Sequence, residues 1–497
     1  MSEKLKKLGR HSLVYGIGNI LAMAGSFLLI PLYTHVLTPG DYGVIELLNR
    51  SSDILMIVMF LGIRQAFIRL YFDHDDQEWH KKVAGTTIVC ILFSTICVVA
   101  ACYPFSTFFA DKLFSNTSYA LFIKMLLVWV PLELLINIGL AFLQIQMKSV
   151  LYVTLNAIKL FLLVISNVVL LYFYQKGIFG FLLSNIWVAA IIAVPFLLFF
   201  VHWSRLQLSM HVFKELFKFG LPLLPATVFM FIINNSDRYL LKMYSDLEAV
   251  GIYALAFKIG MFGTMILMEP FGKVWAPFLF ENYKKDDGPA TVSSVFMLAI
   301  TANVTVALLI SIIAPSVIRM ISAEAFHNAY GLVPFLCAAS ICYSMTSIAD
   351  AGILISKKTY FKPIVNGVCC VIIIALNMFL IPRYGAYGAA ISMGITFFVR
   401  LYLIRTISKK YYFFTIESPR ILLLCLYAVL TYIASLFLFE SDRDSIIMNI
   451  LSIFSFVLFP VLAWYGGVVS NKNKIVILSY VQTWIKDPLC KKRQSFQ

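Results

Sequence analysis

The sequence predicts an all-α membrane protein that crosses the bilayer many times, with two six-helix lobes and two appended C-terminal helices. Of its 497 residues, 61% are hydrophobic and only 13% are charged, and the mean hydropathy is +0.86. Soluble domains are nearer half apolar and a quarter charged. Uncharged runs such as 88–110 and 446–469 are each long enough for a transmembrane helix, which needs ~20 residues. This composition excludes a soluble enzyme.

Fourteen runs of this kind are predicted to span the membrane, at 12–35, 44–67, 83–104, 119–146, 150–174, 178–201, 219–241, 250–280, 291–314, 330–356, 363–381, 386–404, 421–439 and 446–469. The segments between them average ~13 residues, too few for a folded domain. The spans predict an N-terminal lobe over 1–210, a C-terminal lobe over 211–415, and an appended pair of spans with a basic tail over 416–497.

The basic residues are distributed unevenly about these spans. The N-terminus, every second loop and the C-terminal tail hold 26 of the 40 Lys and Arg residues, whereas the opposite loops hold 6. Cytoplasmic loops carry an excess of Lys and Arg. Both termini are therefore predicted to be cytoplasmic. The net charge of +15 follows from this topology and does not indicate a nucleic-acid partner.

An internal repeat divides the chain. Three pairs of glycines, Gly43 with Gly251, Gly177 with Gly385 and Gly180 with Gly388, are all separated by 208 residues. Each repeat contains six spans, an even number, so both enter the membrane in the same orientation. The lobes are therefore predicted to be related by an axis along the membrane normal, as in transporters with parallel repeats. Such a pair of lobes favours a carrier over a channel or a membrane enzyme.

Charged residues inside the spans are costly, at about 2.5–3.5 kcal/mol each on insertion scales, and so require an explanation. There are eight basic and six acidic ones: Arg50, Arg64, Lys124, Lys159, Arg238, Lys258, Lys273, Arg400, Glu46, Asp53, Glu133, Asp237, Glu269 and Asp350. Steps of four and three residues place Glu46 and Asp53 on either side of Arg50 on one helix face. Charged residues lie within spans of both repeats, and together they predict a hydrated interior. Its small basic excess favours an anionic cargo.

The acidic residues have two open interpretations. Glu133, Glu269 and Asp350 are candidates for binding a coupling H⁺ or Na⁺, whereas Glu46 and Asp53 are placed to balance the charge of Arg50. The alternative is that these groups form internal ion pairs alone. No spacing of His, Cys, Asp or Glu indicates a metal site or another cofactor.

Three groups of segments carry a resemblance to a known family. The N-terminal group is Ser12–Tyr15, Pro31–Thr34 and Leu37–Gly43; the middle group is Phe219–Pro225, Asp237–Tyr239 and Val250–Ala256; and the last is Leu376–Ala390. Together they resemble the polysaccharide (O-antigen and capsule) flippases of the multidrug/oligosaccharidyl-lipid/polysaccharide exporter superfamily. They extend over both lobes, roughly positions 12–400, in the same internal order.

The resemblance implies a flippase in the bacterial inner (plasma) membrane. Such proteins move polyprenyl-pyrophosphate-linked oligosaccharide to the outer leaflet for lipopolysaccharide or capsule synthesis, alongside other polysaccharide assembly proteins. It implies positive cavity residues, which we place at Arg50, Lys159, Lys258 and Arg400. The appended spans are similar to the extra pair of the lipid II flippases, which borders a groove for the lipid tail.

Two alternatives remain open. A cation-coupled multidrug exporter of the same superfamily often uses an acidic residue in its first or seventh span. Here the first span has none, and Asp237 in the seventh is followed by Arg238. A membrane polysaccharide polymerase or ligase generally has a large extracytoplasmic loop. With spans of ~20 residues each, the longest outer loop predicted here has only ~15 residues. We therefore expect a transporter and no enzymatic activity.

Overall fold

The computed structural model of the protein describes residues 25, 27–441, 456 and 459, and every regular element among them is a helix. The longer helices are α3 (Pro39–Phe60), α5 (Gln77–Cys102), α7 (Ala120–Ile145), α8 (Ser149–Asn167), α9 (Gly177–Ser204), α11 (Leu224–Tyr244), α12 (Leu247–Asn282), α13 (Gly288–Ile321), α14 (Val333–Ala349), α16 (Phe361–Ser408) and α17 (Ser418–Ser441). The shorter ones are α2 (Ile30–Val36), α4 (Ile63–Tyr71), α6 (Ser106–Phe114), α10 (Met210–Gly220), α15 (Ala351–Ile355), the 3-10 turns η1 (Thr117–Tyr119), η3 (Leu221–Leu223) and η4 (Glu324–Leu332), and the π-helical η2 (Val168–Phe173).

The predicted fold class, an all-α polytopic membrane protein, is confirmed. Within the described residues, nine helical segments are long and apolar enough to cross a membrane, or ten with the bent pair α3–α4. The 48-residue α16 counts once, although Gly385 interrupts it between the predicted spans 363–381 and 386–404. Most of the predicted span 446–469, and residues 12–24 of the first, lie outside the described residues. A total of 14 spans stays a prediction.

The predicted span 44–67 is not one straight helix. α3 ends at Phe60, and α4 begins after a 48° bend. Leu61 and Gly62 at the bend have φ of 49° and 75°, a left-handed conformation that glycine adopts at little cost. The backbone of Gly220 occupies the space where a Cβ of Gly62 would lie. The bend therefore depends on the close approach of a segment that is distant in sequence.

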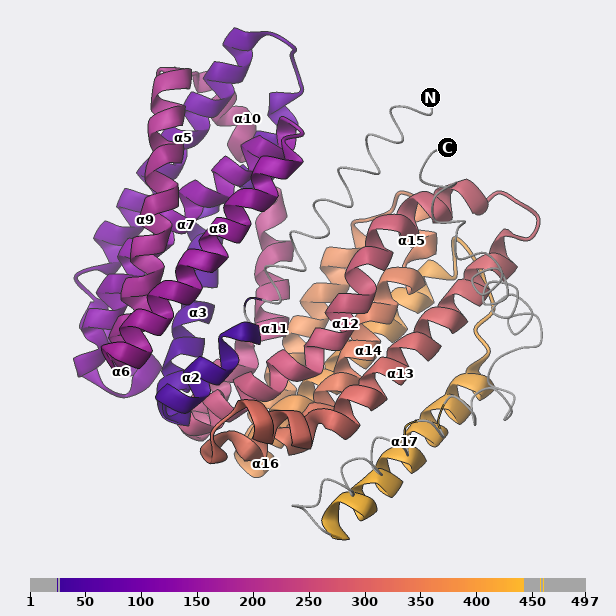
Figure 1. The fold of residues 1–497 in the computed structure, drawn as a ribbon. Coiled ribbons are helices and arrows are strands. Elements are labelled where there is room, and N and C mark those ends of the chain that lie inside the picture. Colours follow the sequence, from indigo (N-terminus) through magenta and orange to yellow (C-terminus); the bar gives the residue numbers. More distant parts are fainter. Residues whose placement is uncertain (1–24, 26, 442–455, 457–458, 460–497) are drawn as a thin grey trace, which may run out of the picture. The chain divides into compact units, whose positions relative to one another are not determined.

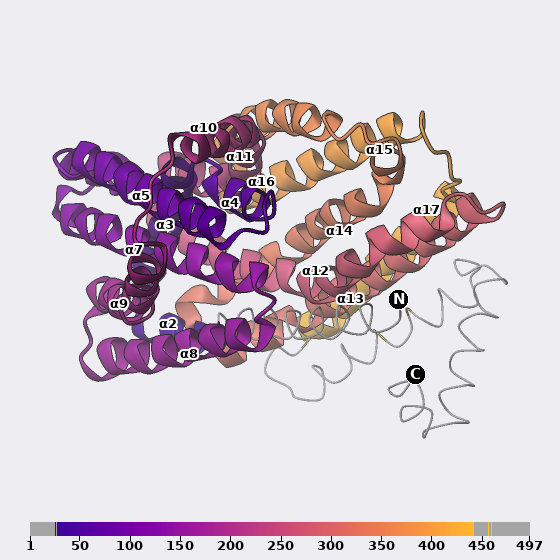
Figure 2. The same cartoon turned by 90° about the horizontal axis from the view of Figure 1, so that it is seen from above.

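The described helices fall into two compact units. The first runs to Lys258 and includes Ile318–Leu332 and Tyr360–Arg400; the second comprises Ile259–Val317, Val333–Thr359 and the chain from Leu401. In the first, α9 packs against α5, α7 and α8 (Figure 1), and these helices lie together again in the view from above (Figure 2). The units follow packing, whereas the predicted lobes 1–210 and 211–415 follow the sequence repeat. The lobes stay a prediction.

In the second unit, α12 packs against both α13 and α14 through small residues. The space beside Gly263 is filled by the side chain of Ile310 on α13, and the space beside Gly260 by the Cβ of Leu336 on α14. Small residues let membrane helices approach closely where no hydrophobic force drives their association. These glycines therefore position the second half of α12.

Two pairs of positions that are partners in the predicted 208-residue repeat have similar local structure. Gly177 and Gly385, which are repeat partners, have nearly identical left-handed φ values of 52° and 53°. Two further partners, Ser184 and Ser392, are both completely buried. Glycine adopts a positive φ at little cost, and both glycines use it at the same register of the predicted repeat.

The other repeat glycines, Gly43 and Gly251, touch each other at the crossing of α3 and α12. A Cβ on Gly43 would meet the carbonyl oxygen of Leu247, and a Cβ on Gly251 would meet that of Pro39. Leu247 lies 208 residues after Pro39, so the contact is reciprocal: each repeat touches the other with equivalent residues. Reciprocal contacts are what a twofold axis produces. The crossing brings the start of both repeats together and positions the site described next.

Candidate functional site

A cluster of six charged residues lies where α3, α11 and the start of α12 meet. Its members, called the charge cluster below, are Glu46, Arg50, Asp53, Asp237, Arg238 and Lys258. All six belong to the first compact unit. They come from helices on both sides of the predicted lobe boundary, which the Gly43–Gly251 crossing holds together.

The ladder predicted on α3 is present. The Arg50 guanidinium lies between two carboxylates, with Nε 3.1 Å from Oε1 of Glu46 and Nη1 2.8 Å from Oδ2 of Asp53. The same Nη1 is 3.3 Å from the amide oxygen of Asn235 on α11. Glu46 is 4% exposed, whereas Arg50 and Asp53 are 28% and 36% exposed. The ladder thus runs from a buried end at Glu46 to a more open end at Asp53.

Arg238 is the most deeply buried cation of the cluster, at 1% exposure. Its guanidinium bonds Oδ1 of Asp237 at 2.8 Å and the carbonyl oxygen of Asn234 at 2.7 Å, and its Nε lies 3.4 Å from Glu46. It also lies 4.0 Å from the centre of the Phe257 ring, a cation–π contact that favours a charged group out of water. Arg238 therefore links the ladder on α3 to α11 and α12.

Two tyrosines close this network. Tyr253, which is completely buried, donates to Oδ2 of Asp237 at 2.5 Å. The ammonium of Lys258 donates to the Tyr42 hydroxyl at 2.8 Å, and its charge acts on Glu46 together with those of Arg50 and Arg238. The cluster contains three acidic and three basic groups, so its formal charge is zero. Ion pairs between its own members stabilise the charge cluster.

Two other predicted residues form a separate pair. Lys159 on α8 bonds both carboxylate oxygens of Glu133 on α7, each at 2.7 Å. Both are largely buried, at 23% and 13% exposure, and Trp129 also donates to Glu133 at 3.2 Å. Their predicted roles differ, cargo binding for Lys159 and ion coupling for Glu133. The structure brings them together as one ion pair.

A charge swap tests whether this pair is structural. We expect Lys159→Gln to destabilise the protein, because it leaves the buried Glu133 carboxylate without its cation. The double variant Lys159→Glu with Glu133→Lys keeps one charge of each sign and should recover most of the lost melting temperature in detergent. If the double variant is less stable than Lys159→Gln, the ion pair does not stabilise the α7–α8 contact.

The remaining predicted site residues lie elsewhere. Nε of Arg400 donates to the amide oxygen of Asn366 at 3.0 Å within the first unit. Asp350 is buried at the break between α14 and α15 in the second unit. The side chain of Glu269 lies outside the described residues. The bond from Arg400 to Asn366 does not connect Arg400 to the charge cluster, and Asp350 belongs to the other compact unit.

A pocket of about 260 Å³ opens at the exposed end of the ladder. Its polar lining is Asp53, Arg64, Gln65 and Thr227, and its apolar lining includes Met56 and Phe60. Asp53 and Arg64 come from either side of the α3–α4 bend. Because of the bend, Asp53 and Arg64 do not lie on one face of a single straight helix, but both still line this pocket. The pocket thus combines a few polar groups with an apolar lining, as small-molecule sites commonly do.

Sequence reasoning missed the central role of Arg238 and the two tyrosines. Asp237 and Arg238 were noted as charges within a span, without an assigned role. Their adjacency in an apolar run was the signal that could have indicated a buried ion pair, because a neighbouring acid and base can neutralise each other. Tyr42 and Tyr253 gave no such signal. Within the described residues, no group of three or more His, Cys, Asp or Glu is placed to hold a metal ion.

These features define a class: a polytopic helical membrane protein with a network of charged residues between its helices. Solved transporters share this fold. The lipid II flippase MurJ in an inward closed conformation is 15% identical, with a TM-score of 0.68 over 92% of this chain and 99% of that chain. An inward-facing multidrug resistance MATE family transporter of the MOP superfamily is 14% identical, with a TM-score of 0.63 over 78% of this chain and 94% of the other.

The chain belongs to the polysaccharide biosynthesis protein family, whose sequence profile matches residues 8–283. A relative, Lsg locus putative protein 1 of Haemophilus influenzae, is 22% identical over 296 residues, which cover 56% of this chain and 67% of the relative. The match includes α2 to α11 and all of α12. It therefore includes every residue of the charge cluster.

Proposed function

We propose that this protein is a flippase that moves a polyprenyl-pyrophosphate-linked oligosaccharide from the cytoplasmic to the outer leaflet by alternating access. The observation that carries the proposal is the family match over residues 8–283, taken with a transporter fold. The product serves cell-surface polysaccharide synthesis, as O-antigen or capsule, with other assembly proteins. The protein acts in a bacterial inner membrane with both termini in the cytoplasm.

The charge cluster is the proposed gate on the outer side of the transporter. By the predicted topology, Glu46, Arg238 and Tyr253 lie toward the outer ends of their helices. They join α3 of the N-terminal lobe to α11 and α12 of the C-terminal lobe. Alternating access requires the lobes to separate at this end, so the ion pair between Arg238 and Glu46 must open in each cycle. A cluster with no net formal charge suits such a reversible closure.

The cargo site is proposed at the positive residues of the interior. Arg50, Lys159, Lys258 and Arg400 would compensate the charge of a pyrophosphate or acidic sugar, and guanidinium offers a planar fork for phosphate oxygens. The pocket beside Asp53 and Arg64 is the proposed place for a sugar ring. Glu133, Glu269 and Asp350 are the proposed sites for a coupling H⁺ or Na⁺. Glu46 and Asp53 balance the charge of Arg50.

Four single variants test the cargo site. Replacing Arg50, Lys159, Lys258 or Arg400 with Gln removes the charge and keeps a polar side chain. We expect at least two of the four variants to abolish surface glycan while the amount of protein in the membrane stays normal. The swap Arg50→Glu with Asp53→Arg keeps one charge of each sign at these two positions but removes the cation that faces Glu46. Transport regained in this double variant would indicate that Arg50 serves internal pairing and not the cargo. Full surface glycan in all four variants, at normal expression, contradicts a cationic cargo site.

Deletion of the gene in its host tests the function itself. The expected result is loss of surface polysaccharide and accumulation of lipid-linked oligosaccharide in the inner leaflet, with both restored by the wild-type gene. The shared MATE fold makes drug export the second candidate. The Asp237 carboxylate is already bonded by Arg238 and Tyr253, so it is a poor cation site. Normal surface glycan with increased sensitivity to cationic drugs identifies an exporter instead.

A further inference from the structure

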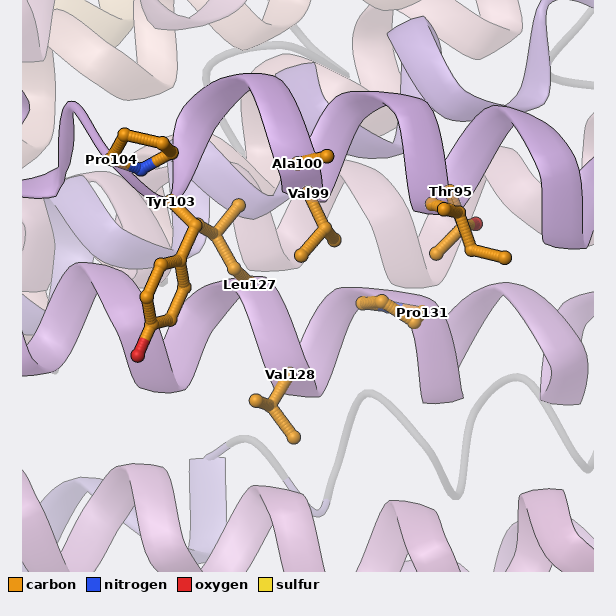
Figure 3. Close-up of a pocket in the computed structure, with 9 residues that line it drawn as sticks. Thr95, Val99, Ala100, Tyr103, Pro104, Leu127, Val128 and Pro131 are labelled. Atoms are coloured by element: carbon orange, nitrogen blue, oxygen red, sulfur yellow. The ribbon is translucent and has the colours of Figure 1, made fainter.

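An apolar pocket lies between α5 and α7, away from the charge cluster. Its volume is about 560 Å³. It is lined by Thr95, Ile96, Val99, Ala100, Tyr103, Pro104, Leu127, Val128 and Pro131. Figure 3 shows Val99 and Ala100 on one helix above Val128 and Pro131 on the next. Thr95 and Tyr103 contribute the only side-chain oxygens of this lining, so the pocket offers almost nothing to hydrogen-bond water or a polar solute.

The pocket faces outward from its two helices. Ile96, Val128 and Tyr103 are 66%, 53% and 50% exposed. Both helices are membrane-spanning segments, so the medium around these side chains is hydrocarbon. An exposed apolar hollow of this size on a membrane helix pair accommodates a flexible hydrocarbon chain better than it does another rigid helix.

A cation lies at one end of the pocket. Lys124 precedes Val128 by four residues and Pro131 by seven, which places all three on one face of α7. Its ammonium lies 5.1 Å from the centre of the Tyr103 ring, which lines the pocket. In the part of the chain that the structure describes, Lys124 has no carboxylate partner within ion-pair distance. Lys124 is four residues from the start of α7, where a lysine ammonium reaches the interface and can meet an anion there.

Aromatic residues mark this end of the pocket as the level of the lipid headgroups. Tyr103 and Phe105 lie between α5 and α6, and Phe108 lies in α6, with exposures of 50%, 60% and 54%. Exposed aromatic rings concentrate at the membrane–water interface. Lys112 lies over the Phe108 ring, 6.0 Å from its centre, and adds a second positive charge at this level. The protein thus presents an apolar hollow beneath a positively charged, aromatic rim.

We propose that the pocket binds an anionic phospholipid, with an acyl chain between α5 and α7 and the headgroup phosphate against Lys124. Charge complementarity selects an anionic lipid, because its phosphate is not neutralised by a cation in its own headgroup and so supplies the anion that Lys124 lacks. The predicted topology puts this end of α7 outside, so the lipid comes from the outer leaflet. The site does not depend on what the protein transports, and it lies on helices other than those of the charge cluster.

Native mass spectrometry of the purified full-length protein tests the site. Dioleoyl phosphatidylglycerol and dioleoyl phosphatidylcholine have the same acyl chains and differ in headgroup charge. We expect one tight phosphatidylglycerol adduct, with at least five-fold weaker binding of phosphatidylcholine. Lys124→Gln should weaken phosphatidylglycerol about five- to ten-fold and phosphatidylcholine much less, because the choline cation already neutralises the phosphate of phosphatidylcholine. Val128→Trp should weaken both lipids, because the indole fills the pocket.

Lys176→Gln is the matched control, since Lys176 is exposed in a loop on the same predicted side and lies outside the pocket. Equal melting temperatures exclude misfolding as the cause of weaker binding. The proposal is overturned if Lys124→Gln binds phosphatidylglycerol as tightly as the wild type. It is also overturned if no lipid adduct forms, as when another part of the chain covers the pocket. A polyprenyl phosphate that displaces phosphatidylglycerol at equal concentration would assign the pocket to the cargo lipid instead.

Discussion

Replacing Arg238 with Met is expected to lower the free energy of unfolding by about 3–5 kcal/mol, because removing one member of a buried ion pair strands the other. Arg238 is 1% exposed and bonds Asp237 at 2.8 Å and the Asn234 carbonyl at 2.7 Å. Met is similar in length and fills much of the space, so the loss reports charge and hydrogen bonding. The buried carboxylate of Asp237 would keep only Tyr253 as a side-chain partner from another helix.

Equilibrium unfolding of the purified protein in mixed detergent micelles measures this loss. Arg64→Met is the control, since Arg64 makes one 3.4 Å hydrogen bond, to Gln144, and should lose about 1 kcal/mol or less. Asp237→Asn in the Arg238→Met background removes the stranded charge and should recover part of the stability. Equal losses in Arg238→Met and Arg64→Met would contradict a central structural role for Arg238.

Gly43→Ala is expected to cost about 1–3 kcal/mol, the usual range for overpacking a close contact. A Cβ on Gly43 would press on the backbone of Leu247, and backbone cannot move aside as a flexible side chain can. Gly251→Ala should cost a similar amount, because it meets the equivalent backbone of Pro39. The double variant should lose less than the sum, since both changes force apart the same crossing.

Gly40 provides a control on the same helix. The atoms nearest to a Cβ at Gly40 are 3.8 Å away, an ordinary contact distance. Gly40→Ala should therefore be neutral or slightly stabilising, because alanine has less conformational freedom to lose on folding. Comparable melting temperatures for Gly43→Ala and Gly40→Ala would mean that the α3–α12 crossing is looser than the structure indicates.

Periodicity along one helix was the most reliable guide to the site. Spacings of four and three residues placed Glu46 and Asp53 beside Arg50, and the structure has both ion pairs. Within a helix, sequence spacing fixes which side chains face each other. The glycine register likewise predicted a repeat whose partners, Gly43 and Gly251, lie in contact.

Contacts between helices could not be predicted in this way. The distance from Lys159 to Glu133 depends on how α8 rotates against α7, which spacing does not specify. The same applies to Arg238, whose reach to Glu46 requires α11 to cross α3 at a particular height. The bend at Gly62 was also missed, because it depends on the backbone of Gly220. These features are set by tertiary packing.

Transbilayer movement of a lipid-linked sugar by the purified protein is the most direct test of the proposed function. The protein is reconstituted into liposomes with a polyprenyl-pyrophosphate-linked N-acetylhexosamine in both leaflets, and a membrane-impermeant enzyme modifies the sugars exposed outside. Without movement, about half of the lipid is protected, because a bilayer has two leaflets of similar area. We expect the wild type to make nearly all of it accessible, and Arg50→Gln to restore protection. Protection of half of the lipid by wild-type protein that is folded and correctly inserted would contradict the flippase.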